Sequence, residues 1–264
     1  MKKKIILVLL ALVLVLAACG GTQGTETKKL KIGVSPVPHA ELAEIAKEKL
    51  AKEGIELEIV VFDDYVQPNL ALKDGDLDAN FFQHVPYLEE FNKEQKTDLV
   101  SAGGVHVEPI AFYSTKVKSL DELTDGAEIL IPNDASNGSR ALKLLAQNGL
   151  IKLPENTTLV TEKDIVENPK NIKFTPIEAA LIPGSYKDVD GAVINSNYAI
   201  SAGLNPVNDG IVIEGQESDY ANVIAVRSAD KDKEVIKKLV ESFQSQEIKD
   251  FIQTKYEGSV VPAF

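Results

Sequence analysis

Apolar side chains recur along this chain with two alternating periods. Residues 55–61 carry an apolar side chain at every second position, which is typical of a half-buried strand. Residues 38–54 instead carry apolar side chains three and four positions apart and end at Gly54, a pattern that predicts a helix. A longer amphipathic stretch with the helical period covers residues 233–255. This alternation predicts an α/β fold with largely parallel sheets.

The same patterns predict the remaining elements. Strands are expected at residues 30–35, 77–82, 110–114, 128–131, 159–161, 190–194, 211–213 and 223–226, and helices at 66–73, 86–95, 119–122, 137–148, 175–182 and 197–202. The helix from 175 is expected because Thr175 and Glu178 form a capping-box pattern. No low-complexity linker divides the chain after residue 29. We therefore expect two lobes joined by crossing strands, with residues 30–110 and 224–264 in lobe 1 and residues 111–223 in lobe 2.

The first 29 residues predict export and membrane anchoring. Three lysines precede an apolar run of 14 residues, 5–18, which is the layout of a secretory signal peptide and shorter than a membrane span of about 20 residues. Residues 16–20, Leu-Ala-Ala-Cys-Gly, resemble the bacterial lipobox, in which the signal is cut before a lipidated cysteine. We expect a signal peptide at 1–18, a lipid on Cys19, a flexible tether at 19–29, and a place at the extracytoplasmic face of the cell membrane. The alternative is an ordinary signal peptide with a coincidental cysteine.

Charge and motif content narrow the class of protein. Cleavage before Cys19 leaves 25 basic and 40 acidic side chains, a net charge of 25 − 40 = −15. This charge argues against nucleic acid as a partner and against an electrostatic hold on anionic lipid. The chain has no phosphate-binding loop, nucleophile elbow or paired-cysteine metal motif. We expect neither an enzyme nor a cofactor or bound metal.

Arg140 is the first candidate for ligand binding. Residues 131–142 read as a strand, a polar loop and a helix start, with Ser136 or Asn137 as the N-cap and Arg140 in the first turn. A guanidinium beside free backbone N–H groups is a good receptor for a carboxylate. The alternative is a surface arginine paired with one of the many acidic side chains.

Three asparagines are further candidates. Asn195 and Asn197 lie where a strand runs into a helix, and Asn222 lies just before a late strand. An asparagine side chain offers both a donor and an acceptor, which suits a ligand that carries an ammonium and a carboxylate. The alternative is capping and turn formation, the usual work of asparagine at such places.

Aromatic and histidine side chains follow several strand-like segments, in positions that read as loops. Tyr65, His84 and His106 are the main examples. They can line an apolar pocket, or pack where loops meet the core. They can also bind a metal, in which case His39, His84 and His106 would act with Glu108, Asp63 or Asp64.

Four longer runs resemble the NlpA/MetQ lipoproteins, the substrate-binding components of methionine importers. They are residues 75–88 (GDLDANFFQHVPYL), 131–134 (IPND), 167–172 (ENPKNI) and 192–199 (AVINSNYA). The resemblance extends from the lipobox to the C-terminal helix. It implies a two-lobed fold like that of type II periplasmic binding proteins, with a ligand cleft between the lobes.

The resemblance also implies roles for individual residues. Arg140 would bind the ligand carboxylate, and Asn197, Asn195 and Asn222 would bind the rest of the amino-acid head group. The side chain would be enclosed by Tyr65, Phe82, His84, Tyr87 and His106.

A function follows from these roles. The protein would be a monomer that binds L-methionine or a close analogue and delivers it to a permease driven by a cytoplasmic ATPase. The alternatives are an importer component for a methionine-containing dipeptide, another amino acid or zinc, and an envelope adhesin that reuses the fold.

Overall fold

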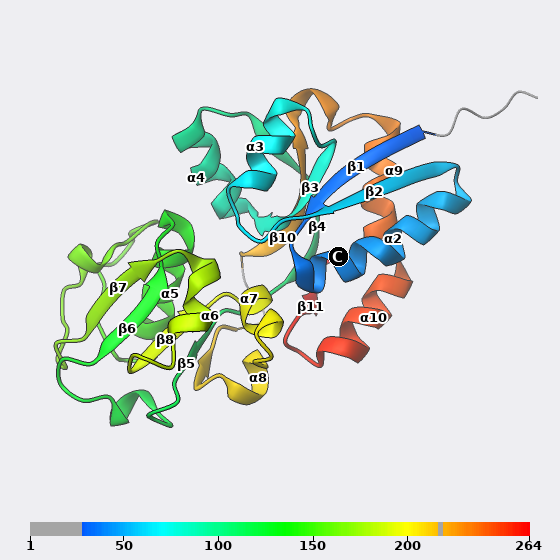
Figure 1. Ribbon diagram of the computed structural model, residues 1–264. Coiled ribbons are helices and arrows are strands. Elements are labelled where there is room, and N and C mark those ends of the chain that lie inside the picture. The colour runs from blue at the N-terminus through cyan, green and yellow to red at the C-terminus, as the bar shows by residue number, and fades with distance from the viewer. Residues whose placement is uncertain (1–27, 216–218) are drawn as a thin grey trace, which may run out of the picture.

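The protein folds into two α/β lobes, each built around its own sheet. The structure is a computed structural model and describes residues 28–215 and 219–264. Figure 1 shows the two lobes, with the N-terminal and C-terminal parts of the chain sharing one lobe and the middle of the chain forming the other. The expected signal peptide, the lipid on Cys19 and most of the tether lie outside the described residues.

The first lobe contains a six-stranded sheet with the order β11-β4-β10-β3-β1-β2. Its strands are β1 (Lys28–Val34), β2 (Ile55–Val61), β3 (Ala79–His84), β4 (Leu99–Val107), β10 (Ala221–Arg227) and β11 (Val261–Pro262). β1 is parallel to β2 and β3, whereas β10 is antiparallel to β3 and β4. β10 therefore brings a late segment of the chain into the middle of the sheet, and the sheet includes it from Ala221 onward.

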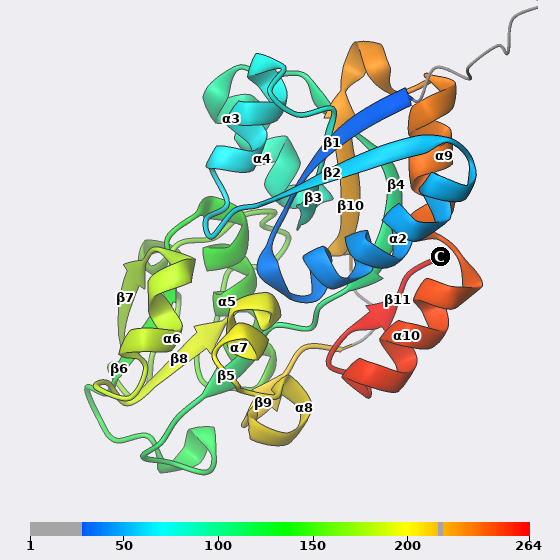
Figure 2. The same cartoon turned by 45° about the vertical axis from the view of Figure 1, so that its right-hand side comes forward.

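Helices cover both faces of this sheet. The helices are α2 (Glu41–Lys52), α3 (Gln67–Asp74), α4 (Val85–Gln95), α9 (Glu234–Phe243) and α10 (Gln246–Tyr256), preceded by the short π-helix η1 (Pro36–Ala40). Figure 2 shows α2, α9 and α10 on one side of the sheet and α3 and α4 on the other. The first group shares a core that contains Leu42, Leu50, Leu239 and Phe243, all 0% exposed.

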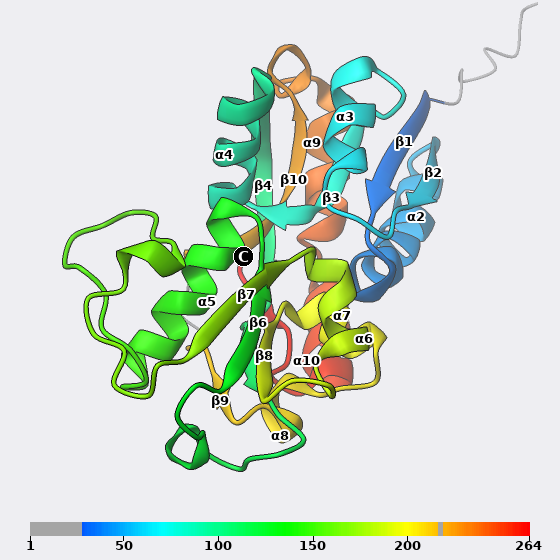
Figure 3. The same ribbon diagram turned by 60° about the vertical axis from the view of Figure 1, so that its left-hand side comes forward.

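The second lobe contains a five-stranded sheet with the order β7-β6-β8-β5-β9. Its strands are β5 (Ala111–Tyr113), β6 (Glu128–Pro132), β7 (Lys173–Ile177), β8 (Gly191–Ile194) and β9 (Val212–Ile213). Its helices are α5 (Ala135–Gln147), α6 (Ile182–Ser185), α7 (Ser196–Ser201) and α8 (Pro206–Asp209). Figure 3 shows α5 on one face of the sheet and α6 and α7 on the other. Four 3-10 helices complete the described elements: η2 (Leu120–Glu122), η3 (Glu162–Asp164), η4 (Ala179–Leu181) and η5 (Ser228–Asp230).

Two segments connect the lobes. One runs from β4 to β5 and the other from β9 to β10. They lie side by side, because the backbone N–H of Glu214 in the second segment donates to the carbonyl of Ile110 in the first, at 2.9 Å.

Two expected elements in the second lobe are wrong. The expected helix does not start at Thr175, because residues 173–177 form strand β7, where Thr175 donates to Glu128 at 2.7 Å, and the helical turns η4 and α6 begin only at Ala179. β7 lies at the edge of its sheet, a place that tolerates Pro176 despite its missing N–H. Residues 159–161 form no strand, since Thr161 caps the 3-10 helix η3 together with Asp164.

Two features of the first lobe were not predicted from the sequence. β4 was absent from the sequence prediction because its glycine pair reads as a loop. Gly103 packs so closely against α9 that a Cβ there would lie 2.6 Å from Val240 Cγ1. The amphipathic stretch 233–255 forms two helices, α9 and α10, which are separated around Ser245. Within residues 28–215 and 219–264, none of the helices has the length and apolar character that crossing a membrane requires.

Candidate ligand-binding site

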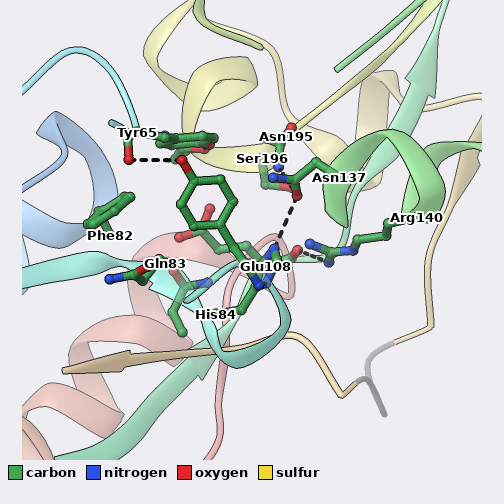
Figure 4. Close-up of a pocket in the computed structure, with 12 residues that line it drawn as sticks. Tyr65, Phe82, Gln83, His84, Glu108, Asn137, Arg140, Asn195 and Ser196 are labelled. Carbon is green, nitrogen blue, oxygen red and sulfur yellow. Dashed lines mark hydrogen bonds between the residues drawn. The ribbon is translucent and has the colours of Figure 1, made fainter. Parts of the chain in front are cut away.

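A cavity lies where the two lobes meet. It receives side chains from both lobes and from the connection between β4 and β5. The lining residues are Tyr65, Phe82, Gln83, His84, Tyr87, Glu108, Asn137, Arg140, Asn195, Ser196, Asn197 and Asn222. Figure 4 shows Arg140 reaching in from α5 on one side, with Tyr65 and Phe82 on the opposite side. The structure therefore brings together all the sequence-predicted binding residues except His106.

The lobes are closed around this cavity. Its free volume is about 20 Å³, room for one or two water molecules. A larger groove of about 480 Å³ borders it and shares Tyr65 and Tyr87 with it. An amino acid can enter only if side chains move or the lobes separate.

Arg140 is buried, and two of its three guanidinium nitrogens make polar contacts. Its Nε donates to Glu214 Oε1 at 2.9 Å, its Nη2 also bonds Glu214 Oε2, and Nη2 donates to the carbonyl of Glu108 at 2.8 Å. The guanidinium carbon lies 4.2 Å from the ring centroid of Tyr220. Helix α5 starts two residues earlier than expected, because Asp134 caps it by accepting from the N–H of Asn137 at 2.8 Å. Arg140 thus lies in the second turn, one turn deeper than the sequence pattern suggested.

Glu108 is the buried acid of the cavity. Its Oε1 accepts from Nε2 of His106 at 2.7 Å and lies 3.3 Å from Nε2 of His39. The backbone N–H of Asn197, at the start of α7, also donates to this carboxylate. Burial raises the pKa of Glu108, while His39, Arg140 and the Asn197 N–H oppose that shift. Hydrogen bonds from His106 and the Asn197 N–H favour the ionised form of Glu108, but burial is the larger effect and the net shift of its pKa is upward.

Among the described residues, one group has the composition of a metal site: His39, His106 and Glu108. Nε2 of His39 also lies 3.1 Å from Asn222 Oδ1, so both partners of this nitrogen are oxygen acceptors. Nε2 therefore carries the hydrogen and donates. Nε2 of His106 hydrogen-bonds Glu108 at 2.7 Å and Nε2 of His39 hydrogen-bonds Asn222 at 3.1 Å, while Nδ1 of each ring is buried without a hydrogen-bond partner among the described residues.

Two cavity-lining amides have unused hydrogen-bonding atoms. Asn195 Oδ1 and Asn197 Nδ2 are buried without a hydrogen-bond partner in the part of the chain that the structure describes. Their other atoms are used: Asn195 Nδ2 donates to Asn137 Oδ1 at 2.9 Å, and Asn197 Oδ1 accepts from Tyr65 at 2.5 Å. A buried donor and acceptor left over beside a cavity are well suited to a polar ligand.

An aromatic cluster closes the other side of the cavity. The ring of Tyr65 lies 5.8 Å from those of Phe82 and Tyr87 and 4.8 Å from that of Tyr198. Tyr198 belongs to the second lobe, and its hydroxyl donates to the carbonyl of Asp63 at 3.0 Å. Burial raises the pKa values of Tyr65 and Tyr87, so both remain neutral phenols. These rings supply an apolar wall that spans the two lobes.

The expectation that His84 and His106 lie in loops is wrong. His84 ends β3 and caps α4, where its Nδ1 accepts from the N–H of Tyr87 at 3.2 Å. His106 lies within β4, is 0% exposed and does not line the cavity. Burial lowers the pKa of His106 to about 3, that of His39 to about 4 and that of His84 to about 3, the last with a further effect of the Arg140 charge. All three are neutral at pH 7.

Comparison with known proteins identifies the family. A family model described as NlpA lipoprotein matches residues 30–264. The chain belongs to the NlpA lipoprotein family. The D-methionine-binding lipoprotein MetQ of Salmonella typhi is 46% identical over 253 residues, 94% of this chain and 93% of that protein. The methionine-binding lipoprotein MetQ of Bacillus subtilis (strain 168) is 44% identical over 271 residues, 98% of each chain.

Solved structures agree with this assignment. A nutrient binding protein from Burkholderia cenocepacia bound to methionine has a TM-score of 0.87 and 46% identity, covering 89% of this chain and all of that one. The MetQ crystal structure has a TM-score of 0.86 at 44% identity. The resemblance inferred from the sequence motifs and the two-lobed fold of this NlpA lipoprotein are both confirmed.

Sequence reasoning missed several cavity residues of this NlpA lipoprotein. Glu108, considered only as a metal ligand, and Gln83, Asn137 and Ser196 were not assigned to the site. Asn137 was treated as a possible cap, although its Oδ1 instead lies 3.1 Å from His84 Nε2. Gln83 is buried in an amide network with Asn69 and Asn80. Gln83 could have been found from its place in the run 75–88, because it lies between Phe82 and His84, which were both predicted to line the site.

The buried histidines should make this NlpA lipoprotein less stable in acid. The free energy of unfolding should therefore fall less between pH 7 and pH 5 in His84→Gln than in the wild type. An unfolded histidine titrates near 6.5, whereas His84 in the fold titrates at about 3. Between these values only the unfolded chain takes up the proton, so the free energy of unfolding falls as the pH drops through 6.5. One such histidine accounts for a loss of about 2 kcal/mol between pH 7 and pH 5.

Glu108 and Asp134 act in the opposite direction because their pKa values are raised. The variant therefore has to be compared with the wild type. Urea unfolding of both proteins at pH 7 and pH 5 measures the difference. If the free energy of unfolding fell equally in the two proteins, His84 would not be neutral in the folded state, contrary to the prediction.

Proposed function

We propose that this protein is a lipid-anchored, extracytoplasmic substrate-binding protein that takes L-methionine, or a close analogue, between its lobes. The observation that carries the proposal is the composition of the cavity. On one side lie the buried Arg140 and Glu108 with the unsatisfied amides of Asn195 and Asn197. On the other side lies the aromatic cluster around Tyr65. That arrangement is complementary to a zwitterion with an apolar side chain.

The head group would be bound by opposite charges. Arg140 takes the ligand carboxylate through Nη1, the guanidinium nitrogen that neither Glu214 nor the Glu108 carbonyl occupies. Glu108 takes the ammonium, held in place by His39, His106 and the N–H of Asn197. Asn195 Oδ1 supplies an acceptor for the ammonium, and Asn197 Nδ2 a donor for the carboxylate.

Two further predicted residues support this head-group site. Asn222 lines the cavity and accepts from His39, so it belongs to the shell that orients Glu108. His106 acts from behind the cavity, through the same carboxylate. Its role in the proposal is therefore to position Glu108, and not to enclose the ligand side chain.

The side chain of the ligand would lie against the rings of Tyr65, Phe82 and Tyr87. A thioether gains from contact with aromatic edges and fits an irregular apolar space. His84, neutral and packed against Tyr87 at 6.3 Å between ring centroids, extends this wall without adding charge. The relative from Burkholderia cenocepacia, described as bound to methionine, supports methionine as the ligand.

Ligand exchange would require the lobes to move. A cavity of about 20 Å³ is too small for an amino acid, so the state described is a closed one. Tyr65 to Asn197 and Tyr198 to Asp63 are hydrogen bonds between the lobes that opening would break. Hinge closure around a ligand is the usual movement of two-lobed receptors.

Delivery to an importer completes the proposal. A lipid on Cys19 and the tether after it would keep the closed receptor next to an ABC permease driven by a cytoplasmic ATPase. We propose that the receptor acts as a monomer and performs no catalysis. The MetQ names of the relatives support the role in methionine import.

Titration calorimetry of the full-length chain in detergent tests the proposal. L-methionine should bind, N-acetylmethionine should bind far more weakly because it lacks the ammonium, and alanine should bind more weakly because it leaves the aromatic wall uncovered. A metal analysis of the same sample covers the zinc alternative. Binding of zinc or of a peptide, with no heat from methionine, would replace the proposal.

A further inference from the structure

Arg140 is held by both segments that connect the lobes. The carbonyl of Glu108 belongs to the connection between β4 and β5, and Glu214 and Tyr220 belong to the connection between β9 and β10. Arg140 itself is on α5 of the second lobe. Arg140, the proposed partner of the ligand carboxylate, therefore contacts both of the segments about which the lobes would hinge.

Glu214 contacts Arg140 from outside the cavity. Its side chain is 15% exposed, and it is not one of the described residues that line the cavity. Its two oxygens take up Nε and one hydrogen of Nη2, while the Glu108 carbonyl takes the other hydrogen of Nη2. With Tyr220 against the flat face of the guanidinium, rotation of the group is blocked from three directions.

The paired contact with the Glu214 carboxylate fixes the orientation of the Arg140 guanidinium and also balances its charge. A carboxylate that accepts from both Nε and Nη2 holds the guanidinium in one plane. Nη1, the remaining nitrogen, is then presented in a fixed direction. Glutamine has the same shape but one oxygen fewer, so one end of its amide would place a donor against a donor.

We propose that Glu214 is a positioning residue that orients Arg140 for the ligand carboxylate and so sets the preference of the cavity for carboxylate ligands. This rests on the proposed function, because it takes the amino-acid head group as the ligand. Glu214 does not touch the ligand. It acts through Arg140, from the segment that connects the lobes.

The first test compares two ligands in Glu214→Gln. L-methionine has the carboxylate, and methioninol has a hydroxymethyl group in its place. In titration calorimetry, the variant should bind methionine about tenfold more weakly and methioninol with unchanged affinity. Glu167→Gln is the matched control, because it makes the same substitution in an exposed ion pair with Lys152, and it should leave both affinities unchanged.

The second test needs no ligand. Arg140 and Arg227 are the two arginines of the chain, so nitrogen-15 spectra should resolve two Nε–H signals. Arg227 Nε donates to Asp230 at 2.7 Å and serves as an internal reference. In Glu214→Gln the Arg140 signal should shift and exchange faster with water, and the Arg227 signal should not change.

Three results would overturn the inference: an Arg140 signal that does not change, an equal loss of affinity for both ligands, and tighter methionine binding in the variant. An equal loss would indicate general damage, and tighter binding would mean that Glu214 competes with the ligand for Arg140. If the wild-type protein fails to bind methionine, the proposed function is wrong, and the nitrogen-15 comparison still decides whether Glu214 orients Arg140.

Discussion

Arg140→Ala should abolish methionine binding, with a loss of at least about a hundredfold in affinity. The cavity has one buried cation close to two buried or half-buried acids, Glu108 and Glu214. Removing it takes away the charge-assisted bonds to the ligand carboxylate and leaves a negative site that repels that group. A hydrogen bond to a charged group contributes roughly 1.5–3 kcal/mol, and 2.7 kcal/mol corresponds to about a hundredfold.

Calorimetry with L-methionine measures this loss, and thermal unfolding shows whether the variant is folded. Arg140→Lys is a second variant that keeps the charge but lacks the planar fork, and it should bind weakly rather than not at all. Arg227→Ala is the matched control, since it removes the other arginine, which pairs with Asp230 in the first lobe. Unchanged methionine affinity in folded Arg140→Ala would refute the assignment of the carboxylate receptor.

Cys19→Ala should move the protein from the membrane fraction to the soluble fraction while leaving methionine affinity intact. The described part of the chain has no helix suited to span a membrane, and its strongly acidic surface has little attraction to anionic lipid. Attachment would then depend on the lipid. The cavity residues lie far along the chain, from Tyr65 onward, so a change at the tether should not alter them.

Fractionation of cells that produce the wild type and the variant measures the first effect, and calorimetry on the two proteins measures the second. Methionine uptake should fall in the variant because the receptor is no longer held near its permease. Persistent membrane attachment of Cys19→Ala would mean that another segment anchors the protein.

The fold was predictable from the sequence where the apolar period is regular. Helix α2 and strand β2 follow their patterns closely, because each buries one regular face. Strand β4 escaped prediction because Gly103 and Gly104 look like a loop, whereas Gly103 in fact lets α9 pack closely against the strand. The expected helix at Thr175 failed since capping-box spacing also fits an edge strand that contains proline.

The candidate site was predictable only in part. Arg140 and the asparagines at 195 and 197 stand at strand-to-helix junctions, which is where α/β folds place ligands. Glu108 carries no such mark, because its importance comes from burial beside His39, which lies 69 positions earlier (108 − 39) in the chain. Glu214 meets Arg140 across 74 positions, a contact that only the fold can reveal.

The most direct test of the account is mass spectrometry of what the protein carries. The wild-type chain, purified without added ligand and then denatured, should release a compound with the mass of methionine, in an amount approaching one per protein. The same preparation of Arg140→Ala should release none. Release of a different compound or of zinc by the wild type, with no methionine, would contradict the central claim that this cavity binds methionine.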